Sequence, residues 1–298
     1  MPTLTVHFPF LENLSHPPRL LISRVGGQKI NTGMDYTVAM QRAIALAEKG
    51  LGKTAPNPIV GAVIIDSTGA VIAEGFHDRM NSADHAEVVA IKAAGSKAKG
   101  STIVVTLEPC NHTGSTGPCS QAIIDAGITT VVYAVSDANP HAAGGADTLR
   151  AAGITVIEGV LKAEAAYSNR AWLMKIRKNR PFFTWKVATT LDAKVAATDG
   201  TSKWITNETS RADVQVLRRQ ADAILVGTNT VIADDPHLIP RGEFAGYTHN
   251  PVRVICGEQT LPTDAKVFDN AADTVVVASK DLDVLVENLN ELGVNHVF

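Results

Sequence analysis

The residues with the clearest chemistry lie between positions 85 and 119. His85, Cys110 and Cys119 offer one imidazole and two thiols, a set of three protein ligands for a divalent ion. Three protein ligands with an open fourth position are typical of catalytic zinc sites, whereas structural zinc sites have four protein ligands. Glu87 follows His85 too closely to bind the same ion with ease. We expect its carboxylate beside the open position, where it could accept a proton from a zinc-bound water.

This set of residues predicts the hydrolytic removal of an amine from an aromatic ring. Zinc lowers the pKa of its bound water to about 7, so hydroxide is available at neutral pH. Hydroxide would add to the ring carbon that bears the amine, and Glu87 would carry the proton to the ring and to the departing ammonia. Taken singly, each residue has a simpler explanation as a helix cap or a core side chain. Together, His-x-Glu, Pro109-Cys110 and a second cysteine at a helix start favour a zinc deaminase of amino-pyrimidines or amino-purines.

The length of the loop between the two cysteines narrows the class of zinc deaminase. Residues 111–118 separate Cys110 from Cys119, whereas the common deaminase pattern places only two residues there. A longer loop enlarges the wall of the pocket. Cys256 lies instead in an apolar segment, residues 252–256, and we predict that it belongs to the core.

The elements around these residues alternate between helices and strands. Apolar residues at helical spacing predict a helix within residues 35–52, ended by Gly50, and a helix that begins at His85. Apolar runs predict strands at 59–65, 70–74, 101–107, 130–134 and 154–157, and further helices are predicted at 120–126 and 146–152. This alternation predicts a layered α/β domain with His85 and Glu87 at a helix N-terminus.

A second domain is predicted to follow residue 178. A helix over 163–178 ends in Lys178-Asn179-Arg180-Pro181, which is basic, polar and terminated by proline. Beyond it we predict strands at 182–188, 223–226, 251–256 and 274–278, helices at 207–220 and 282–292, and an irregular stretch at 189–204. The predicted organisation is an irregular extension over residues 1–33, a zinc-dependent deaminase domain over 34–178 and a second domain over 179–298.

Composition excludes several classes of protein. The chain has 298 residues, a net charge of -3 and three cysteines, and 45% of its residues are hydrophobic. The low, odd cysteine count fits a reducing, cytoplasmic location and no disulfide framework. No apolar run reaches the ~20 residues of a membrane helix, and the N-terminal residues lack a signal-peptide pattern. The acidic balance disfavours a nucleic-acid substrate and leaves a small molecule.

Longer segments carry a resemblance to a known family. In the first domain they are Pro56-Asn57-Pro58, Val60-Gly61-Ala62-Val63, His85-Ala86-Glu87, Thr106 to Cys119 and Asp137-Ala138-Asn139-Pro140. In the second they are Lys186 to Lys194, Ser202 to Thr206, and Ile224 to Gly227 followed by Ala233 to Pro236. Over about residues 34–298 the chain resembles the bifunctional riboflavin-biosynthesis deaminase/reductase family. The resemblance implies a cytidine-deaminase-like α/β/α layered domain followed by a dihydrofolate-reductase-like α/β domain.

The resemblance implies two consecutive reactions. The first is the zinc-dependent hydrolytic deamination of 2,5-diamino-6-(5-phosphoribosylamino)pyrimidin-4-one. The second is the NADPH-dependent reduction of the ribosyl group to a ribityl chain. One Zn²⁺ per chain would be held by His85, Cys110 and Cys119, with Glu87 as the catalytic proton carrier.

The resemblance also implies contacts with substrate and cofactor. Asn57 and His77 would line the deaminase pocket. The matching positions of the reductase are Ala188, Trp204, Thr230 and Asp234 for NADPH, and Ser202, Arg218, Leu238 and Arg241 for the substrate. A guanidinium group suits bidentate phosphate binding, which supports Arg218 and Arg241. Without the resemblance, both would be interpreted as solvated surface arginines, and Trp204 as a core residue.

Three features depart from the family pattern. Ser115 stands where the family has Arg or Lys, which removes a phosphate contact. Ala193 stands where the family has Gly in Leu-Asp-Gly-Lys, which adds a Cβ near the cofactor. The chain ends at Phe298, whereas the family continues through a Glu-Gly-Gly segment. We therefore expect a C-terminally incomplete reductase domain, weak NADPH binding and a last strand at 294–298 without neighbours.

Two other functions compete with this interpretation. One is a nucleoside or nucleic-acid deaminase with an inactive second domain. The other is a non-catalytic scaffold stabilised by zinc with four protein ligands. An exposed sheet edge in the second domain would favour a homo-oligomer, a dimer or a tetramer.

Overall fold

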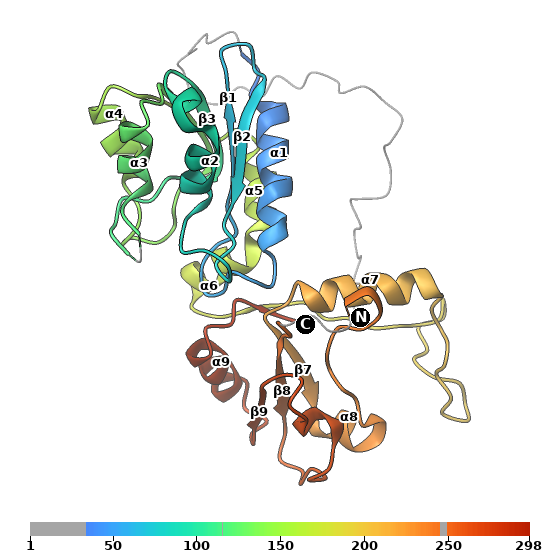
Figure 1. The fold of residues 1–298 in the computed structure, drawn as a ribbon. Coiled ribbons are helices and arrows are strands. Elements are labelled where there is room, and N and C mark those ends of the chain that lie inside the picture. Colours follow the sequence, from blue (N-terminus) through green and yellow to red (C-terminus); the bar gives the residue numbers. More distant parts are fainter. Residues whose placement is uncertain (1–33, 115, 245–248) are drawn as a thin grey trace. The chain divides into compact units, whose positions relative to one another are not determined.

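The computed structural model describes residues 34–114, 116–244 and 249–298 (Figure 1). Within these ranges the chain forms two five-stranded sheets, each with its own helices. The predicted extension over residues 1–33 and the departure at Ser115 lie outside the described residues.

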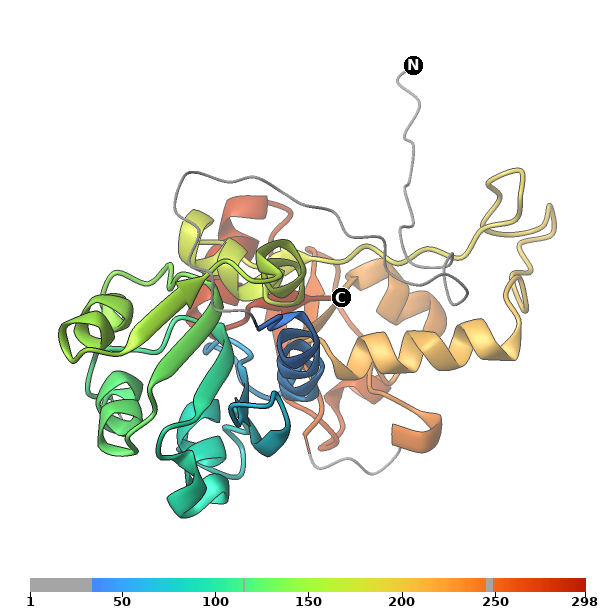
Figure 2. The ribbon, with the colours of Figure 1, turned by 90° about the horizontal axis from the view of Figure 1, so that it is seen from above.

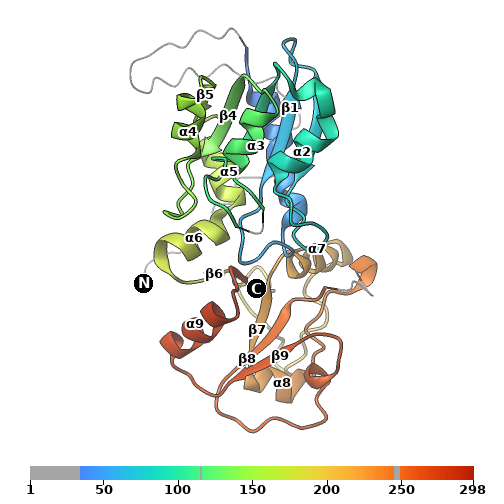
Figure 3. The same ribbon diagram turned by 60° about the vertical axis from the view of Figure 1, so that its left-hand side comes forward.

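The first sheet has the strand order β2-β1-β3-β4-β5 (Figure 3). Its strands are β1 (Gly61–Ile65), β2 (Val71–Phe76), β3 (Thr102–Leu107), β4 (Thr130–Val135) and β5 (Thr155–Glu158). β1 pairs antiparallel with β2 and β3, whereas β3, β4 and β5 run parallel. Every residue of β1 is buried, as are five of the six residues of both β3 and β4. Burial on both faces explains why these segments are continuous apolar runs in the sequence.

Helices cover both faces of this sheet (Figure 2). The helices are α1 (Thr37–Ala47), α2 (Ala86–Ala94), α3 (Cys119–Asp125), α4 (Gly145–Ala151) and α5 (Lys162–Ser168), with 3-10 turns η1 (Glu48–Gly50) and η2 (Gly95–Ala98). α1 packs on β1 and β3 and contacts α5, which packs on β4. α2 packs on β1 and β2, and it contacts α3, which contacts α4. The α/β/α layering implied by the resemblance is confirmed.

Glycines allow helices on both faces to approach the strands closely. A Cβ on Gly61 of β1 would lie 2.0 Å from the backbone oxygen of Ala43 in α1. A Cβ on Gly75 of β2 would lie 2.3 Å from the backbone oxygen of Ala86 in α2. Neither distance leaves room for a methyl group. The first turn of α2 therefore lies against β2 because position 75 has no side chain, and this turn carries the acid of the predicted site.

The predicted helix over 163–178 is wrong in one respect: it is two helices. α5 ends at Ser168, and α6 (Arg170–Lys178) begins after Asn169. The Asn169 side chain is buried, and it accepts a hydrogen bond from Ile59 N (3.2 Å) and donates one to Ile59 O (2.9 Å). These two hydrogen bonds hold the Asn169 side chain against the backbone of Ile59, which explains why the helix breaks at Asn169. α6 ends at Lys178, and Asn179 adopts a φ of 50°.

The second sheet has the strand order β6-β10-β7-β8-β9, and each neighbouring pair is parallel. Its strands are β6 (Phe182–Phe183), β7 (Ala223–Gly227), β8 (Val252–Cys256), β9 (Thr274–Val277) and β10 (His296–Val297). Its helices are α7 (Glu208–Arg219), α8 (Thr228–Asp234) and α9 (Leu282–Glu291), with 3-10 turns η3 (Gly242–Phe244) and η4 (Lys266–Phe268). One core cluster joins the sheet to Leu285 and Leu289 of α9, and a second joins it to Val231 of α8 and Val267 of η4.

Three predictions for the second domain are corrected by this sheet. The expected last strand is not isolated, because β10 lies between β6 and β7 and pairs with both. The expected strand at 182–188 stops at Phe183, and Trp185 beyond it is 84% exposed. α8 was not expected from the sequence, because the apolar residues after Gly227 are too few for a helical pattern to be recognised. Cys256 lies in β8, partly buried against the core, as predicted.

Within residues 34–114, 116–244 and 249–298, no helix combines the length and the apolar character that crossing a membrane requires.

Gly75→Ala is expected to destabilise the first domain by about 3 kcal/mol, because the new methyl group forces α2 away from β2. The displacement should also lower the amount of zinc that the purified protein retains. Urea unfolding and metal analysis measure the two effects. Gly227→Ala is the matched control, since a Cβ there meets only the backbone oxygen of Cys256 at 3.9 Å. Unchanged stability and zinc content in Gly75→Ala would contradict the proposed close approach.

Candidate active site and metal centre

The three predicted metal ligands converge. The Nδ1 atom of His85 lies 3.6 Å from the Sγ atom of Cys110 and 3.3 Å from that of Cys119. All three ligand atoms lie within 4.8 Å of one another. A tetrahedral zinc ion with ordinary bond lengths places a nitrogen and a sulfur ligand roughly 3.6 Å apart. The donor set and its spacing therefore fit Zn²⁺.

Three different elements deliver these ligands. His85 is the N-cap residue of α2, Cys110 follows the end of β3, and Cys119 is the first residue of α3. The backbone N–H of Cys119 lies 3.4 Å from the Sγ atom of Cys110, toward which it donates. The ligands thus lie at the N-termini of α2 and α3, whose positive dipole ends favour negative charge on the thiols.

The pKa values of the two thiols are shifted in opposite directions. The hydrogen bond from Cys119, together with the nearby His85 ring, lowers the pKa of Cys110, although burial opposes this. The same hydrogen bond and burial raise the pKa of Cys119. The hydrogen bond to Cys110 also raises the pKa of His85. Since zinc binds thiolates and neutral imidazole, its binding here releases protons.

Glu87 lies in the first turn of α2 and is 3% exposed. Burial, and secondarily the charge of Cys110, raises the pKa of Glu87 to about 7. A carboxyl group with such a pKa can both accept and donate a proton near neutral pH. The sequence placed this side chain beside the metal ligands, and the structure brings it there.

A cavity of about 310 Å³ opens onto this cluster. Asn57 and His77 line it, as the resemblance implied. His77 is 4% exposed, and neither of its ring nitrogens has a well-formed hydrogen bond within the described residues. Burial, and then the charge of His85, lowers the pKa of His77. A neutral imidazole with free donor and acceptor capacity is suited to bind a heterocyclic ring.

The lining residues that had no assigned role in the sequence analysis include Glu108, Asp137, Asn139 and Trp172. Glu108 is 8% exposed and accepts hydrogen bonds from the backbone N–H groups of Asp137 (3.1 Å), Gly144 (3.3 Å) and Ala146 (3.1 Å). It therefore ties the loop after β4 to the segment that ends in Cys110. The signal in the sequence was an acidic residue at the end of a buried strand, directly before Pro109-Cys110.

In the second domain, two of the predicted substrate-contacting residues lie near each other. Arg218 is near the end of α7, and Arg241 is in the loop after α8. The Nε and Nη1 atoms of Arg218 are buried without a hydrogen-bond partner in the described part of the chain. Burial, and secondarily the charge of Arg241, lowers the pKa of Arg218. A half-buried guanidinium with two unsatisfied buried nitrogens, beside a second guanidinium, forms an environment that an anion would stabilise.

The other predicted reductase residues occupy several elements. Thr230 and Asp234 lie one turn apart on α8. Trp204 is 70% exposed and lies 4.4 Å from the guanidinium carbon of Arg211, so it is not a core residue. Leu238 is 4% exposed and packs in the core, which leaves its backbone for any substrate contact.

The long segment between β6 and α7 carries the remaining predicted residues. Ala188 and Ser202 lie on it outside any helix or strand. Among the described residues, no hydrogen bond or ion pair joins the four predicted NADPH contacts to one another. Ala193 in this segment has a φ of 61°. Glycine adopts that conformation without strain, which gives a physical reason for the glycine that the family has at this position.

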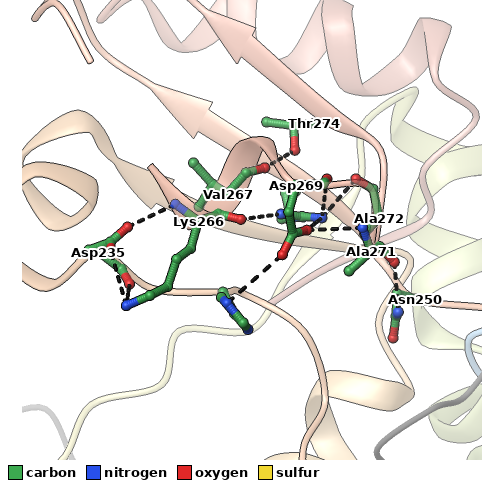
Figure 4. A network of polar contacts seen from close by, with 10 residues as sticks. Asp235, Asn250, Lys266, Val267, Asp269, Ala271, Ala272 and Thr274 are labelled. Carbon is green, nitrogen blue, oxygen red and sulfur yellow. Dashed lines mark hydrogen bonds and ion pairs between the residues drawn. The ribbon is translucent and has the colours of Figure 1, made fainter. Parts of the chain in front are cut away.

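Polar contacts hold the loop after α8, which carries two of the predicted substrate-contacting residues (Figure 4). Asp235 accepts a hydrogen bond from Lys266 N (2.8 Å) and pairs with Lys266 Nζ (2.9 Å). The Nε2 atom of His237 lies 3.8 Å from Oδ2 of Asp269. Asp269 in turn pairs at 2.8 Å with Arg253, whose side chain is fully buried. The buried arginine therefore holds Asp269 in place, and Lys266 holds the start of the loop through Asp235.

Two family models match the chain. Residues 34–135 match the cytidine and deoxycytidylate deaminase zinc-binding region, and residues 181–298 match the RibD C-terminal domain. The riboflavin biosynthesis protein RibD of Mycobacterium tuberculosis is 46% identical over 247 residues, which are 82% of this chain and 72% of that protein. RibD of Aquifex aeolicus is 46% identical over 257 residues, or 86% of this chain and 71% of that protein. The chain belongs to the RibD family.

Solved structures of the family agree. A Thermotoga maritima diaminohydroxyphosphoribosylaminopyrimidine deaminase/5-amino-6-(5-phosphoribosylamino)uracil reductase superimposes with a TM-score of 0.81 at 39% identity, covering 88% of this chain and 79% of that one. Acinetobacter baumannii RibD gives a TM-score of 0.77 at 36% identity, with the same coverage.

Family membership confirms the fold class and both activities. The chain carries the zinc-dependent deaminase and the NADPH-dependent reductase of riboflavin biosynthesis, and it acts on a small molecule. The alternative with an inactive second domain is not supported, since that domain matches the reductase of the family. How tightly NADPH binds stays a prediction.

Glu108→Gln is expected to weaken zinc retention and to lower deaminase kcat/KM roughly tenfold or more. The amide removes the charge, and its NH₂ group faces backbone donors where an oxygen accepted before. Competition with a zinc chelator and ammonia release measure the two effects. Glu158→Gln is the control, because that glutamate ends β5 and bonds only the Tyr133 hydroxyl and, at 3.9 Å, Arg150. Wild-type zinc affinity in Glu108→Gln would refute the positioning role.

Proposed function

We propose that this chain deaminates 2,5-diamino-6-(5-phosphoribosylamino)pyrimidin-4-one at a zinc site formed by His85, Cys110 and Cys119. The observation that carries the proposal is the convergence of one imidazole and two thiols beside the buried Glu87. Among the described residues this cluster contains three ligands, which leaves a fourth position for water. The scaffold alternative needs four protein ligands and therefore fits less well.

Glu87 has the central role in the proposed reaction. Bound zinc supplies the Lewis acidity that makes a water nucleophilic at neutral pH. Glu87 accepts one proton of that water and delivers it to the ring nitrogen, and it then transfers the remaining proton, from the hydroxyl group added to the ring carbon, to the departing amine. Ammonia leaves, and an oxygen remains on the ring carbon. Asn57 and His77, which line the cavity, hold the heterocycle.

The second domain is proposed to bind the phosphate of the deaminated product. Arg218 and Arg241 supply the charge, and burial of Arg218 strengthens its interaction with an anion. Bound NADPH supplies the hydride that reduces the ribosyl group to a ribityl chain. Its proposed contacts are Ala188, Trp204, Thr230 and Asp234, with Ser202 and the backbone of Leu238 at the substrate.

Three further features are proposed. The domain division follows residue 178, where α6 ends and Asn179 adopts a positive φ. A homo-oligomer is supported by exposed apolar side chains on the segment after β6, such as Trp185, Leu191 and Val195. The free thiols and the use of NADPH fit a cytoplasmic location.

Glu87→Gln is expected to lower the rate of ammonia release by roughly 10²- to 10⁴-fold, because the amide cannot carry the proton. Zinc content should stay near one ion per chain, since the three ligands are unchanged. Stopped assays for ammonia with parallel metal analysis test this. Glu164→Gln is a matched control, because Glu164 also lies in the first turn of a helix and is exposed. Normal turnover in Glu87→Gln would exclude the proposed role.

Arg218→Gln is expected to raise the reductase KM for the phosphorylated substrate roughly ten- to a hundredfold, with a smaller change in kcat. Without ligand, the variant should unfold at the same or a higher temperature, because an unsatisfied buried charge beside Arg241 is removed. Inorganic phosphate should stabilise the wild type more than the variant. Arg150→Gln serves as the control, since Arg150 is exposed and paired with Asp147. Equal stabilisation by phosphate would count against the site.

A further inference from the structure

A second hollow adjoins the deaminase cavity. Its volume is about 330 Å³. The residues that line both spaces are Asn57, His77, His85 and His112. The residues that line only the second hollow are Arg79, Ala83, Gly114 and Thr116. A ligand whose ring lies against Glu87 can therefore extend past the histidines into this polar space.

The two spaces differ in chemistry. The first contains the carboxyl groups of Glu87, Glu108 and Asp137 and the apolar side chains of Leu107 and Trp172. The second contains no carboxylate and no large apolar side chain. Arg79 is the only residue with a permanent positive charge among the described residues that line either space. The loop over residues 111–118 adds no lysine or arginine in the sequence. Negative charge is therefore favoured at Arg79 and disfavoured near the reacting carbon.

One hydrogen bond holds the Arg79 side chain in place, but this bond uses only part of its hydrogen-bonding capacity. It is exposed, and its Nη1 atom donates a hydrogen bond to the backbone oxygen of Ala55 at 2.9 Å. A guanidinium has five N–H donors, so most remain available. Within the described residues, no carboxylate forms an ion pair with it. The bond to Ala55 fixes the group beside the turn that carries Asn57.

We propose that Arg79 is a specificity-determining residue of the deaminase that binds the phosphate of the substrate in this hollow. The inference rests on the proposed deaminase function. A phosphate monoester carries between one and two negative charges at neutral pH and accepts bidentate hydrogen bonds from a guanidinium. His112 and Thr116 line the same space and add an imidazole and a hydroxyl group. The ring enters the first space, and the phosphoribosylamino group extends to Arg79.

The test compares two substrates in three enzymes. The substrates are the phosphorylated diaminopyrimidinone and its ribosylamino analogue without phosphate. The enzymes are the wild type, Arg79→Gln and Arg79→Lys. For Arg79→Gln, kcat/KM on the phosphorylated substrate should fall roughly ten- to a hundredfold, mainly through KM. On the phosphate-free analogue it should change less than about threefold, and Arg79→Lys should be intermediate on the phosphorylated substrate.

Arg42→Gln is the matched control. Arg42 is also an exposed arginine of this domain, but it pairs with Glu74 and lines neither space. It should retain the wild-type ratio of the two kcat/KM values. Raising the ionic strength should reduce the preference of the wild type for the phosphorylated substrate, because an exposed ion pair is screened.

The outcomes separate the inference from the proposed function. If the wild type does not release ammonia from the phosphorylated substrate, the proposed function fails. If the wild type turns over both substrates with equal kcat/KM, the phosphate is not recognised and the inference fails alone. If Arg79→Gln slows both substrates equally, Arg79 acts only by bracing the turn at Ala55, which also overturns the inference. Should Arg79→Gln not fold, Arg79→Lys and the wild-type ratio decide the question by the same criteria.

Discussion

The first domain depends on the meeting of three donor atoms within 4.8 Å. At this distance the two thiols and the imidazole interact, and as a result the pKa of Cys110 is lowered while that of Cys119 is raised. A divalent cation that binds both sulfurs stabilises both of them as thiolates. The surrounding architecture serves this convergence. Gly75 lets α2 begin beside β2, and Glu108 ties the strand end before Cys110 to the next loop.

Both domains bring a buried ionisable group to a predicted reaction site. In the first, Glu87 lies in a buried position that raises its pKa to about 7, which suits proton transfer in both directions. In the second, Arg218 has buried donors without a protein partner. Such groups destabilise the unliganded fold, and the ligand compensates for them. Buried ionisable groups that lack a partner within the protein therefore indicate the chemistry of the ligand that it binds.

The sequence was sufficient for what depends on local pattern. His85, Glu87, Cys110 and Cys119 could be selected as candidates because zinc ligands have restricted chemistry, and the structure brings the three ligand atoms together. The alternation of strands and helices, also a local pattern, predicted the layered α/β arrangement of the first domain. The resemblance gave the second domain and its two arginines, and the burial of Arg218 supports the phosphate role that was assigned to it.

The sequence was insufficient for what depends on tertiary contacts. The helix break at Asn169 could not be foreseen, because its cause is a hydrogen-bonded pair of contacts with Ile59 far away in the chain. The role of Glu108 depends on N–H groups from residues 137–146, which no local pattern indicates. The expectation that the last strand lacks neighbours was wrong, since it was drawn from the longer chains of the family, whereas the pairing of β10 with β6 and β7 is a tertiary contact that no local pattern indicates. Arg79 belongs to none of the sequence motifs. Its proposed role follows only from its position as the positively charged residue that lines the second hollow.

The two proposed phosphate sites differ in their electrostatic environments. Arg79 is exposed, so mobile ions screen it over a Debye length of about 8 Å at physiological ionic strength. Arg218 is half-buried, and its Nε and Nη1 atoms are fully buried, where a lower effective dielectric constant strengthens the attraction. The phosphate is remote from the carbon that loses its amine, and it is unchanged by the reaction. Contacts to it bind substrate and product of the deamination equally, so a tight contact at Arg79 would slow product release without accelerating the chemistry. If both proposed contacts form, a screened arginine in the first domain and a half-buried one in the second would suit a product that must leave the first site and be held at the second.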